Sequence, residues 1–220
     1  VASRGLGDVY KRQGGALHIA RHLEPLNKTK TLGLLLPTSG GSPLGALAGW
    51  MLGKTVVPIN YLLKPEEMNY IIRDCGCDTV LTVQPMLEFL GGKADECIFG
   101  SKREGSGGVE ATPTSSVKHL VKVEDISFKG APPVRWPAGA AEDDLGVLLY
   151  TSGTSGKPKG VMLSHGNVRS NIRQIQDYVS FTSDDVMLGV LPQFHSFGLT
   201  VLTLLPLMLG LKAVYTARFI

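Results

Sequence analysis

The sequence predicts an α/β fold built from two doubly wound, mostly parallel βαβ sheets, of which the second is truncated. From residue 32 onward, short apolar runs of strand length alternate with segments of helix length. Such alternation is typical of parallel sheets covered by helices. The 220 residues are 43% hydrophobic and include 27 glycines. This composition excludes global disorder and allows a sizeable core with many turns.

The first block begins with a strand, a helix and a second strand. Leu32–Pro37 is a continuous apolar run bounded by turn residues, which indicates a buried parallel strand. Small and apolar residues fill 43–52 and stop at Gly53, which indicates a helix. The β-branched run at 55–59 ends at Asn60 and indicates the second strand.

An amphipathic helix and a third strand continue this block. The helix at 65–74 has proline in its first turn, acidic residues behind it and Gly76 as its cap. Its apolar face carries Met68 and Ile72, and all these signals favour a helix. Residues 78–83 indicate the third strand. The order strand, helix, strand, helix, strand is that of a doubly wound sheet.

The chain divides into three predicted parts. Residues 1–13 show neither helix nor strand periodicity, and 8–13 resemble a translated sequencing adaptor. We therefore interpret 1–13 as an adaptor-derived or disordered leader. Residues 14–144 form the first α/β subdomain, with a variable, polar loop at 101–116. Residues 145–220 begin a second α/β subdomain that we expect to be truncated.

The second block places a polar loop between two strands. A buried strand is predicted at 145–150, a glycine-rich loop at 151–160 and a short β-like run at 161–163. The remaining predicted elements of the chain are a strand at 117–123, a helix at 166–179 capped by Ser164, a strand at 185–191, an apolar helix at 197–209 and a strand at 211–215.

Charge and cysteine content narrow the function classes. The net charge is +3 and no run of five basic residues occurs, which argues against a nucleic-acid partner. Three cysteines fit a reducing compartment, and we expect a cytoplasmic protein. Cys75-Gly76-Cys77 could be a metal or redox pair, but no second pair follows, which favours free, buried or partly buried thiols. The uncharged stretch at 194–211 is interrupted by glycine and proline, so burial explains it as well as membrane-surface contact does.

The loop at 151–160 carries the clearest chemical signal. Four hydroxyl residues, three glycines, Lys157 and Lys159 lie within its ten positions. Glycines let backbone N–H groups turn toward an anion, hydroxyls add donors or ligate magnesium, and lysines supply charge to phosphate oxygens. The loop is not a Walker A motif, because Thr151 and Pro158 stand where that motif requires glycine and serine or threonine. We predict a polyphosphate site here.

The residues of this loop resemble a known family. The run YTSGTSGKPKGV at 150–161 is similar to the signature loop of the adenylate-forming (AMP-binding) superfamily, which comprises acyl-CoA synthetases, peptide-synthetase adenylation domains and luciferases. Residues 164–167 resemble its sequel, and Leu191–Gly198 resembles the aromatic-histidine motif beside its acyl pocket. The resemblance covers about residues 29–220 and is weakest between 91 and 143. Within the superfamily, 194–200 is most similar to fatty acyl-CoA and acyl-carrier-protein synthetases.

The resemblance implies an incomplete N-terminal domain of an adenylate-forming enzyme. Such an enzyme uses MgATP to convert a carboxylate, here a fatty acid, into an acyl-adenylate with release of pyrophosphate. It then transfers the acyl group to the thiol of CoA or of the phosphopantetheine arm of an acyl carrier protein. The family's later magnesium- and adenine-binding segment and its catalytic lysine have no counterpart in these residues, so we expect the 220 residues alone to be inactive.

The resemblance also assigns roles to residues. The expected catalytic residues are Thr151, Lys159 and His195, and Thr151 is also the expected magnesium ligand. The expected ATP-binding residues are Thr151, Ser152, Gly153, Thr154, Ser155, Gly156, Lys157, Lys159 and Gly160. The expected acyl-substrate residues are Phe194, His195, Phe197 and Gly198.

Three other hypotheses remain. An amino-acid adenylation domain of a peptide synthetase would carry the same loop. A nucleotide-binding module could keep the loop without catalysis. A serine hydrolase is suggested by residues 194–198, which resemble a G-x-S-x-G elbow around Ser196, although two phenylalanines crowd that serine.

Overall fold

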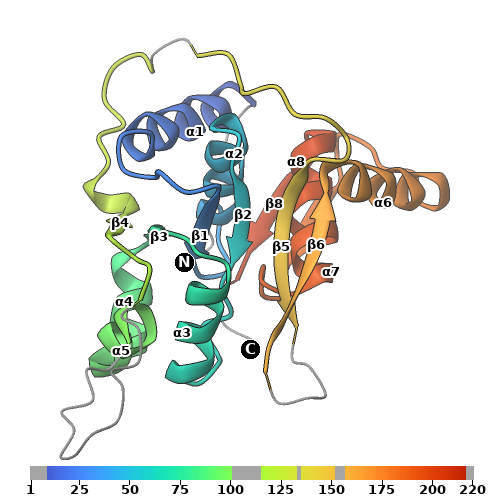
Figure 1. Cartoon of the computed structure of the whole chain (residues 1–220). Coiled ribbons are helices and arrows are strands. Elements are labelled where there is room, and N and C mark those ends of the chain that lie inside the picture. The colour runs from blue at the N-terminus through green and yellow to red at the C-terminus, as the bar shows by residue number, and fades with distance from the viewer. Residues whose placement is uncertain (1–8, 101–114, 133–134, 152–156, 217–220) are drawn as a thin grey trace, which may run out of the picture.

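A computed structural model describes residues 9–100, 115–132, 135–151 and 157–216. Its helices and strands, in chain order, are α1 (Val9–Leu23), β1 (Thr31–Leu35), α2 (Gly41–Met51), β2 (Thr55–Pro58), α3 (Pro65–Asp74), β3 (Thr79–Thr82), α4 (Gln84–Leu90), α5 (Ala94–Phe99), β4 (His119–Lys122), β5 (Leu145–Thr151), β6 (Lys159–Ser164), α6 (His165–Tyr178), β7 (Val186–Gly189), α7 (Ser196–Leu199), α8 (Leu205–Leu209) and β8 (Lys212–Tyr215). A π-helical turn at Thr200–Leu204 joins α7 to α8. Figure 1 shows their arrangement.

The strands form one large and one small sheet. The large sheet has the order β4-β3-β1-β2-β5-β6, and all its neighbours are parallel except β5 and β6. Strands β7 and β8 make a separate two-stranded parallel sheet. The predicted α/β class with two mainly parallel sheets is therefore confirmed.

The division between the sheets differs from the prediction. The sequence analysis placed residues 145–150 at the start of the second unit, but β5 pairs with β2 in the large sheet, with Val147 opposite Val56. The Thr55 hydroxyl also donates a hydrogen bond to the Leu145 carbonyl at 2.9 Å. The small sheet begins only at β7, because the connection before β5 returns the chain to the edge of β2 (Figure 1). A periodic pattern specifies a strand but not the edge that it joins.

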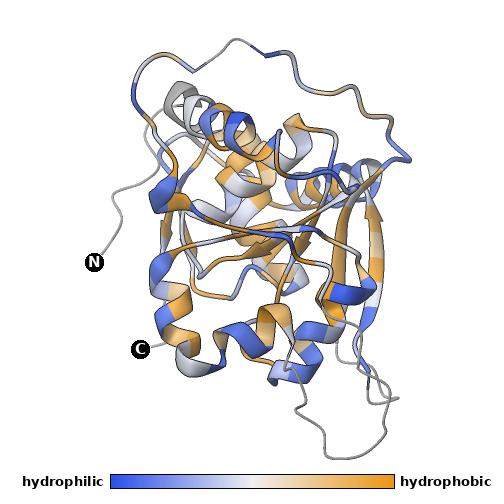
Figure 2. Cartoon of the chain, turned by 60° about the vertical axis from the view of Figure 1, so that its left-hand side comes forward, coloured by the Kyte–Doolittle hydropathy of each residue, from blue (hydrophilic) through white to orange (hydrophobic). Residues whose placement is uncertain are grey.

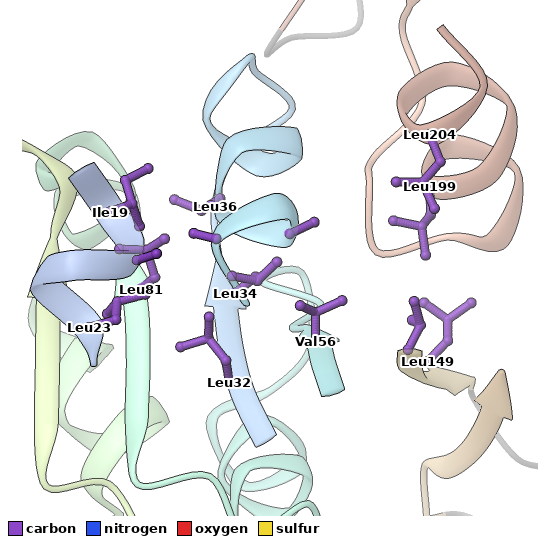
Figure 3. Packing of buried hydrophobic residues seen from close by; sticks show 14 of the residues in the cluster. Ile19, Leu23, Leu32, Leu34, Leu36, Val56, Leu81, Leu149, Leu199 and Leu204 are labelled. Carbon is purple, nitrogen blue, oxygen red and sulfur yellow. The ribbon is translucent and has the colours of Figure 1, made fainter. Parts of the chain in front are cut away.

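Helices cover both faces of the large sheet at β1 and β3. Successive residues of a strand point to opposite faces, and in β1 Leu34 packs with α1 and α2, whereas Leu35 packs with α3, α4 and α5. Figure 2 shows the apolar strands between these two helical layers. The first cluster reaches the C-terminal helices, where Leu149 of β5 faces Leu199 and Leu204 (Figure 3).

Helix α1 was not predicted, and it begins inside the predicted leader. Residues 9–13 are helical, while residues 1–8 lie outside the described residues. The helix could have been found from its apolar face, because Ala16, Ile19, Ala20 and Leu23 follow the helical spacing and are at most 1% exposed. The short helices α4 and α5 were also missed. The predicted loop at 101–116 lies almost entirely outside the described residues.

The apolar C-terminal helix predicted at 197–209 is present with an irregular centre. The Thr203 hydroxyl donates to the Gly198 carbonyl five residues earlier at 2.8 Å, which suits the wider π-helical turn. Pro206 follows in the first turn of α8, where it needs no N–H partner. Gly210 ends the segment with a φ of +71°. Among the helices that the structure describes, none has the length and apolarity needed to span a membrane.

Candidate functional site

The predicted phosphate loop connects two antiparallel neighbours in the large sheet. At the open end of the β5–β6 pair, Thr151 lies opposite Lys159 and Tyr150 lies opposite Gly160. The predicted site residues Ser152, Gly153, Thr154, Ser155 and Gly156 lie outside the described residues. The prediction that a strand rather than a helix follows the loop is confirmed.

The polar side chains at this open end face solvent. Thr151, Lys157 and Lys159 are exposed, whereas Pro158 between the lysines is buried. One hydroxyl and two ammonium groups thus lie beside the loop. The ammonium groups can bind phosphate oxygens, and the hydroxyl oxygen can ligate a magnesium ion that the phosphates hold. Gly160 lies close to its partner strand, because a Cβ there would come within 3.0 Å of the Leu148 side chain.

A buried tyrosine anchors the end of β5. Tyr150 is 7% exposed, and its hydroxyl donates a hydrogen bond to Asp74 Oδ2 at 2.6 Å. Burial and this hydrogen bond raise the pKa of the Tyr150 hydroxyl, so it remains a neutral donor. Asp74 is the last residue of α3. The contact therefore ties the strand directly before Thr151 to a helix of the first block.

The same helix supports the other end of the loop. The Lys157 ammonium lies 5.7 Å from the centroid of the Tyr70 ring, within the range of a cation–π contact. Tyr70 and Asp74 are four residues apart on α3 and therefore share one side of it. Sequence analysis missed both residues, and their only signal was a polar i, i+4 pair on the exposed face of the predicted helix.

The aromatic-histidine motif surrounds the start of α7. Phe194 is 4% exposed and packs edge-to-face against Tyr61, with ring centroids 5.0 Å apart. His195 precedes the first residue of α7 and is exposed, with its ring centroid 4.7 Å from that of Phe194. Phe197 is 53% exposed. An aromatic wall with an exposed imidazole can border an apolar substrate that carries a polar end.

Two neighbouring residues determine how this motif is held. Gln193 is 4% exposed, accepts a hydrogen bond from Ser39 N at 3.2 Å and donates to Ser39 O at 3.2 Å and to Thr203 Oγ1 at 2.9 Å. Gly198 is buried, and a Cβ there would overlap the Pro192 carbonyl oxygen. Gln193 was not among the predicted site residues. Gly198 was, and this steric overlap explains why the position requires glycine.

The structure brings the predicted residues together as two groups, one at the loop and one at α7. Among the described residues, no hydrogen bond or ring contact joins Lys157 or Lys159 to His195. Each group is instead tied to the first block, through α3 or through Ser39 and Tyr61. The described part of the chain holds no cluster of three or more His, Cys, Asp or Glu residues that could bind a metal ion. A magnesium ion held mainly by phosphates and one hydroxyl needs no such cluster.

The serine-hydrolase hypothesis gains no support from the geometry. Ser196 and His195 are adjacent in sequence, and within 9–100, 115–132, 135–151 and 157–216 no carboxylate makes an ion pair with His195. A serine–histidine pair needs such a group to orient the imidazole.

Comparison with known proteins gives consistent matches. Residues 14–220 match the sequence profile of a family described as AMP-binding enzyme. The chain is 30% identical over 172 residues to the mitochondrial malonate–CoA ligase ACSF3 of Homo sapiens, covering 78% of this chain and 27% of that protein. It is 29% identical over 194 residues to 4-coumarate–CoA ligase 5 of Oryza sativa subsp. japonica, covering 86% and 34%.

A solved structure matches the fold over nearly the whole chain. This is o-succinylbenzoate coenzyme A synthetase (MenE) from Bacillus subtilis in complex with ATP and a magnesium ion, with a TM-score of 0.71 and 25% identity. The match covers 95% of this chain and 49% of that one. The chain thus spans about half the length of this structure and less of the two curated relatives.

Proposed function

Because the chain belongs to the family of AMP-binding enzymes, we propose that it supplies the phosphate-binding and acyl-bordering part of an acid–thiol ligase. In this proposal the ligase activates a carboxylate with MgATP, forms an acyl-adenylate and releases pyrophosphate. It then transfers the acyl group to a thiol. The observation that carries the proposal is the β5–β6 pair, which presents Thr151, Lys157 and Lys159 around one glycine-rich connection.

The loop residues would act mainly through charge. Pyrophosphate gains negative charge as it leaves the α-phosphorus, and fixed cations stabilise that charge in the transition state. The exposure of Lys157 and Lys159 beside the loop supports this role, as does the contact of Lys157 with the Tyr70 ring. Thr151 would hold the magnesium ion, which neutralises phosphate charge when bound. Ser152–Gly156 and Gly160 keep their predicted role as binders of ATP phosphates.

The α7 residues would act on the acyl side. His195 would border the adenylate and the acyl carboxyl group, since its imidazole is exposed and its backbone begins α7. Phe194 and Phe197 would shape the acyl entrance, and Gly198 lets the chain turn there without a side chain. The buried Phe194–Tyr61 contact supports this arrangement because it limits the movement of the residue before His195.

We propose a fatty acid as the carboxylate, because Phe197, two residues after His195, exposes an apolar ring at the start of α7. The names of the relatives widen the substrate panel to malonate and 4-coumarate. Those names also favour CoA as the thiol, with the phosphopantetheine arm of an acyl carrier protein as the second candidate. A cytoplasmic location with peripheral membrane contact completes the proposal.

Two measurements test this function. The first is calorimetric binding of MgATP and of pyrophosphate to the 220-residue chain. Lys157→Ala and Lys159→Ala should each weaken binding by about tenfold, the value of one charged contact of 1.4 kcal/mol. Lys212→Ala is the matched control, since that lysine is exposed in β8 on the other sheet. An equal loss of affinity in all three variants would indicate nonspecific binding through positive charge and would contradict a phosphate site at the loop.

The second measurement is carboxylate-dependent ATP–pyrophosphate exchange by the complete protein that the gene encodes. The panel comprises acetate to palmitate, malonate, 4-coumarate and amino acids. Exchange with fatty acids, lost in Lys159→Ala and His195→Ala but retained in Ser196→Ala, would support the proposal. Exchange with an amino acid alone would move the protein to the peptide-synthetase hypothesis. MgATP binding without any exchange would favour the non-catalytic nucleotide-binding module.

A further inference from the structure

Two thiols meet where α3 ends. Cys75 is the C-cap of the helix, Gly76 follows with a φ of +63°, and Cys77 leads into β3. Both sulfur atoms approach the same acceptor, the Ile72 carbonyl oxygen, at 3.4 Å from Cys75 Sγ and 4.0 Å from Cys77 Sγ. The left-handed glycine folds the chain back on itself, which brings these side chains together.

The two thiols differ in environment. Cys75 is partly exposed, whereas Cys77 is 0% exposed and packs in the second core cluster. Interaction with the neighbouring Cys77 thiol lowers the pKa of Cys75, and interaction with Cys75, together with burial, raises the pKa of Cys77. The accessible sulfur is therefore the better nucleophile, and the buried one keeps its proton.

We propose that Cys75 and Cys77 form a redox-reactive dithiol that small-molecule disulfides oxidise to an intramolecular disulfide. Cys75 is the attacking thiol and Cys77 is the resolving thiol. Their Cα atoms are two residues apart, which limits the separation to about 7 Å, and a turn shortens it into the range that a disulfide bridges, about 4.4–6.8 Å. This inference lies outside the proposed ligase function and does not depend on it.

The reaction is an ordinary pair of exchanges. The Cys75 thiolate attacks one sulfur of the small disulfide, the S–S bond breaks, and the leaving thiolate takes a proton from water. Cys77 then loses its proton to water and attacks the Cys75 sulfur of the mixed disulfide, which releases the second small thiol. Two protein thiols are oxidised to one disulfide, and one small disulfide is reduced to two thiols.

The position of the pair connects it to the loop. Cys75 directly follows Asp74, whose carboxylate holds the Tyr150 hydroxyl at 2.6 Å. The Thr31 hydroxyl also donates to the Cys75 carbonyl at 3.0 Å, and Ser116 Oγ donates to the Cys77 carbonyl at 2.8 Å. The turn is thus held by hydrogen bonds from three other segments of the chain, so disulfide formation would move the sulfur atoms more than the backbone.

The test uses the reduced 220-residue chain, glutathione disulfide, an acid quench and alkylation of the remaining thiols, followed by mass spectrometry of tryptic peptides. Cys75 and Cys77 fall in the peptide Asp74–Lys93, and the control thiol Cys97 falls in the next peptide, which begins at Ala94. Cys97 is also a buried free thiol. We expect the first peptide to lose two hydrogen masses, while Cys97 in the second carries the alkyl group and no glutathione. In separate alkylation of the reduced chain, Cys75 should react at least about tenfold faster than Cys97.

Two variants assign the roles. Cys77→Ser should accumulate a stable glutathione adduct on Cys75, because no resolving thiol remains. Cys75→Ser should leave Cys77 unmodified. Circular dichroism checks that each variant is folded. If a variant is unfolded, the peptide masses of the wild-type chain still test the proposal. Reaction of Cys97 before Cys75, or a wild-type adduct that never yields the internal disulfide, would overturn the proposal.

Discussion

The inner strands of the large sheet are covered very differently from its edge strand β6 and from the small sheet, although all are built from similar apolar residues. Strands β2 and β3 are buried at every position. In contrast, Val186 and Leu188 of β7 are 54% and 58% exposed, and Met162 of β6 is 71% exposed. The difference arises from neighbouring elements, since helices cover both faces at β1–β3 but not at β6 and β7. Local hydrophobicity shows what a strand can bury, and tertiary neighbours determine what it does bury.

The candidate site belongs to the less covered region but is held by the well-covered one. Tyr150 is bound by Asp74, Gln193 by Ser39, and Phe194 packs on Tyr61. The exposed residues of the candidate site are thus positioned by contacts between their neighbours and the buried core. The following predictions test this division, from the largest expected effect to the smallest.

Removing a core side chain should separate the two regions most clearly. Leu81 of β3 is 0% exposed, and Leu81→Ala should lower the free energy of unfolding by about 2–5 kcal/mol through lost burial and a cavity. Leu188→Ala, in the exposed β7, should stay within about 0.5 kcal/mol. Urea unfolding followed by circular dichroism measures both. Similar losses would mean that β7 is covered in solution and that the comparison fails.

A methyl group at Gly198 should disturb the start of α7. The added Cβ would overlap the Pro192 carbonyl oxygen, and backbone atoms cannot move aside like a flexible side chain. We expect Gly198→Ala to cost about 1–3 kcal/mol in urea unfolding. Gly139→Ala is the control, because a Cβ there meets no atom within 4 Å. An unchanged Gly198→Ala stability would show that this turn adapts.

The first block should carry an acid-sensitive contact at Asp78. Burial alone would raise the pKa of this carboxyl, but hydrogen bonds from Lys28 N at 2.9 Å, Thr79 and Thr29 outweigh it and lower the pKa. A lowered folded pKa means that the contribution to stability is complete above the unfolded value of about 3.9 and disappears as the pH falls through the folded value.

Asp78→Asn should therefore lower the free energy of unfolding by about 1.5 kcal/mol at pH 7, because it weakens the hydrogen bonds to the charged carboxylate. The difference from wild type should shrink as the pH falls below 4, in unfolding curves measured from about pH 7 to pH 2. Asp177→Asn, at an exposed position of α6, serves as the control. A cost that is independent of pH would show that packing rather than charge makes Asp78 important.

The smallest expected effect concerns a single hydrogen bond between α2 and β5. Trp50 Nε1 donates to the Gly146 carbonyl at 2.8 Å, and the Trp50 ring lies edge-to-face with His165. Trp50→Phe keeps an aromatic ring but loses the donor, so we expect a loss of about 1 kcal/mol in thermal or urea unfolding. Trp136→Phe, at an 88% exposed position, should leave stability unchanged. A neutral Trp50→Phe would indicate that the other contacts of β5 hold it without this hydrogen bond.

The sequence by itself determined most elements and the chemistry of the loop. The bounds of α3 match the prediction, and Ser164 caps α6 through Asn167 N at 3.1 Å as expected. These features depend on residues within one or two turns of each other, so periodicity, proline, glycine and capping signals reveal them. The glycine-rich run at 151–160 was recognisable for the same reason, since its residues are consecutive.

Only the tertiary structure decided which edge β5 joins, which strands are covered, and which residues support the site. Asp74 and Tyr150 are 76 positions apart, and Ser39 and Gln193 are 154 positions apart. Pairings over such distances depend on how whole elements pack, which no local pattern encodes. The physical reason is that a side chain's type and spacing are properties of its own segment, whereas burial and hydrogen-bond partners are supplied by segments that folding brings beside it.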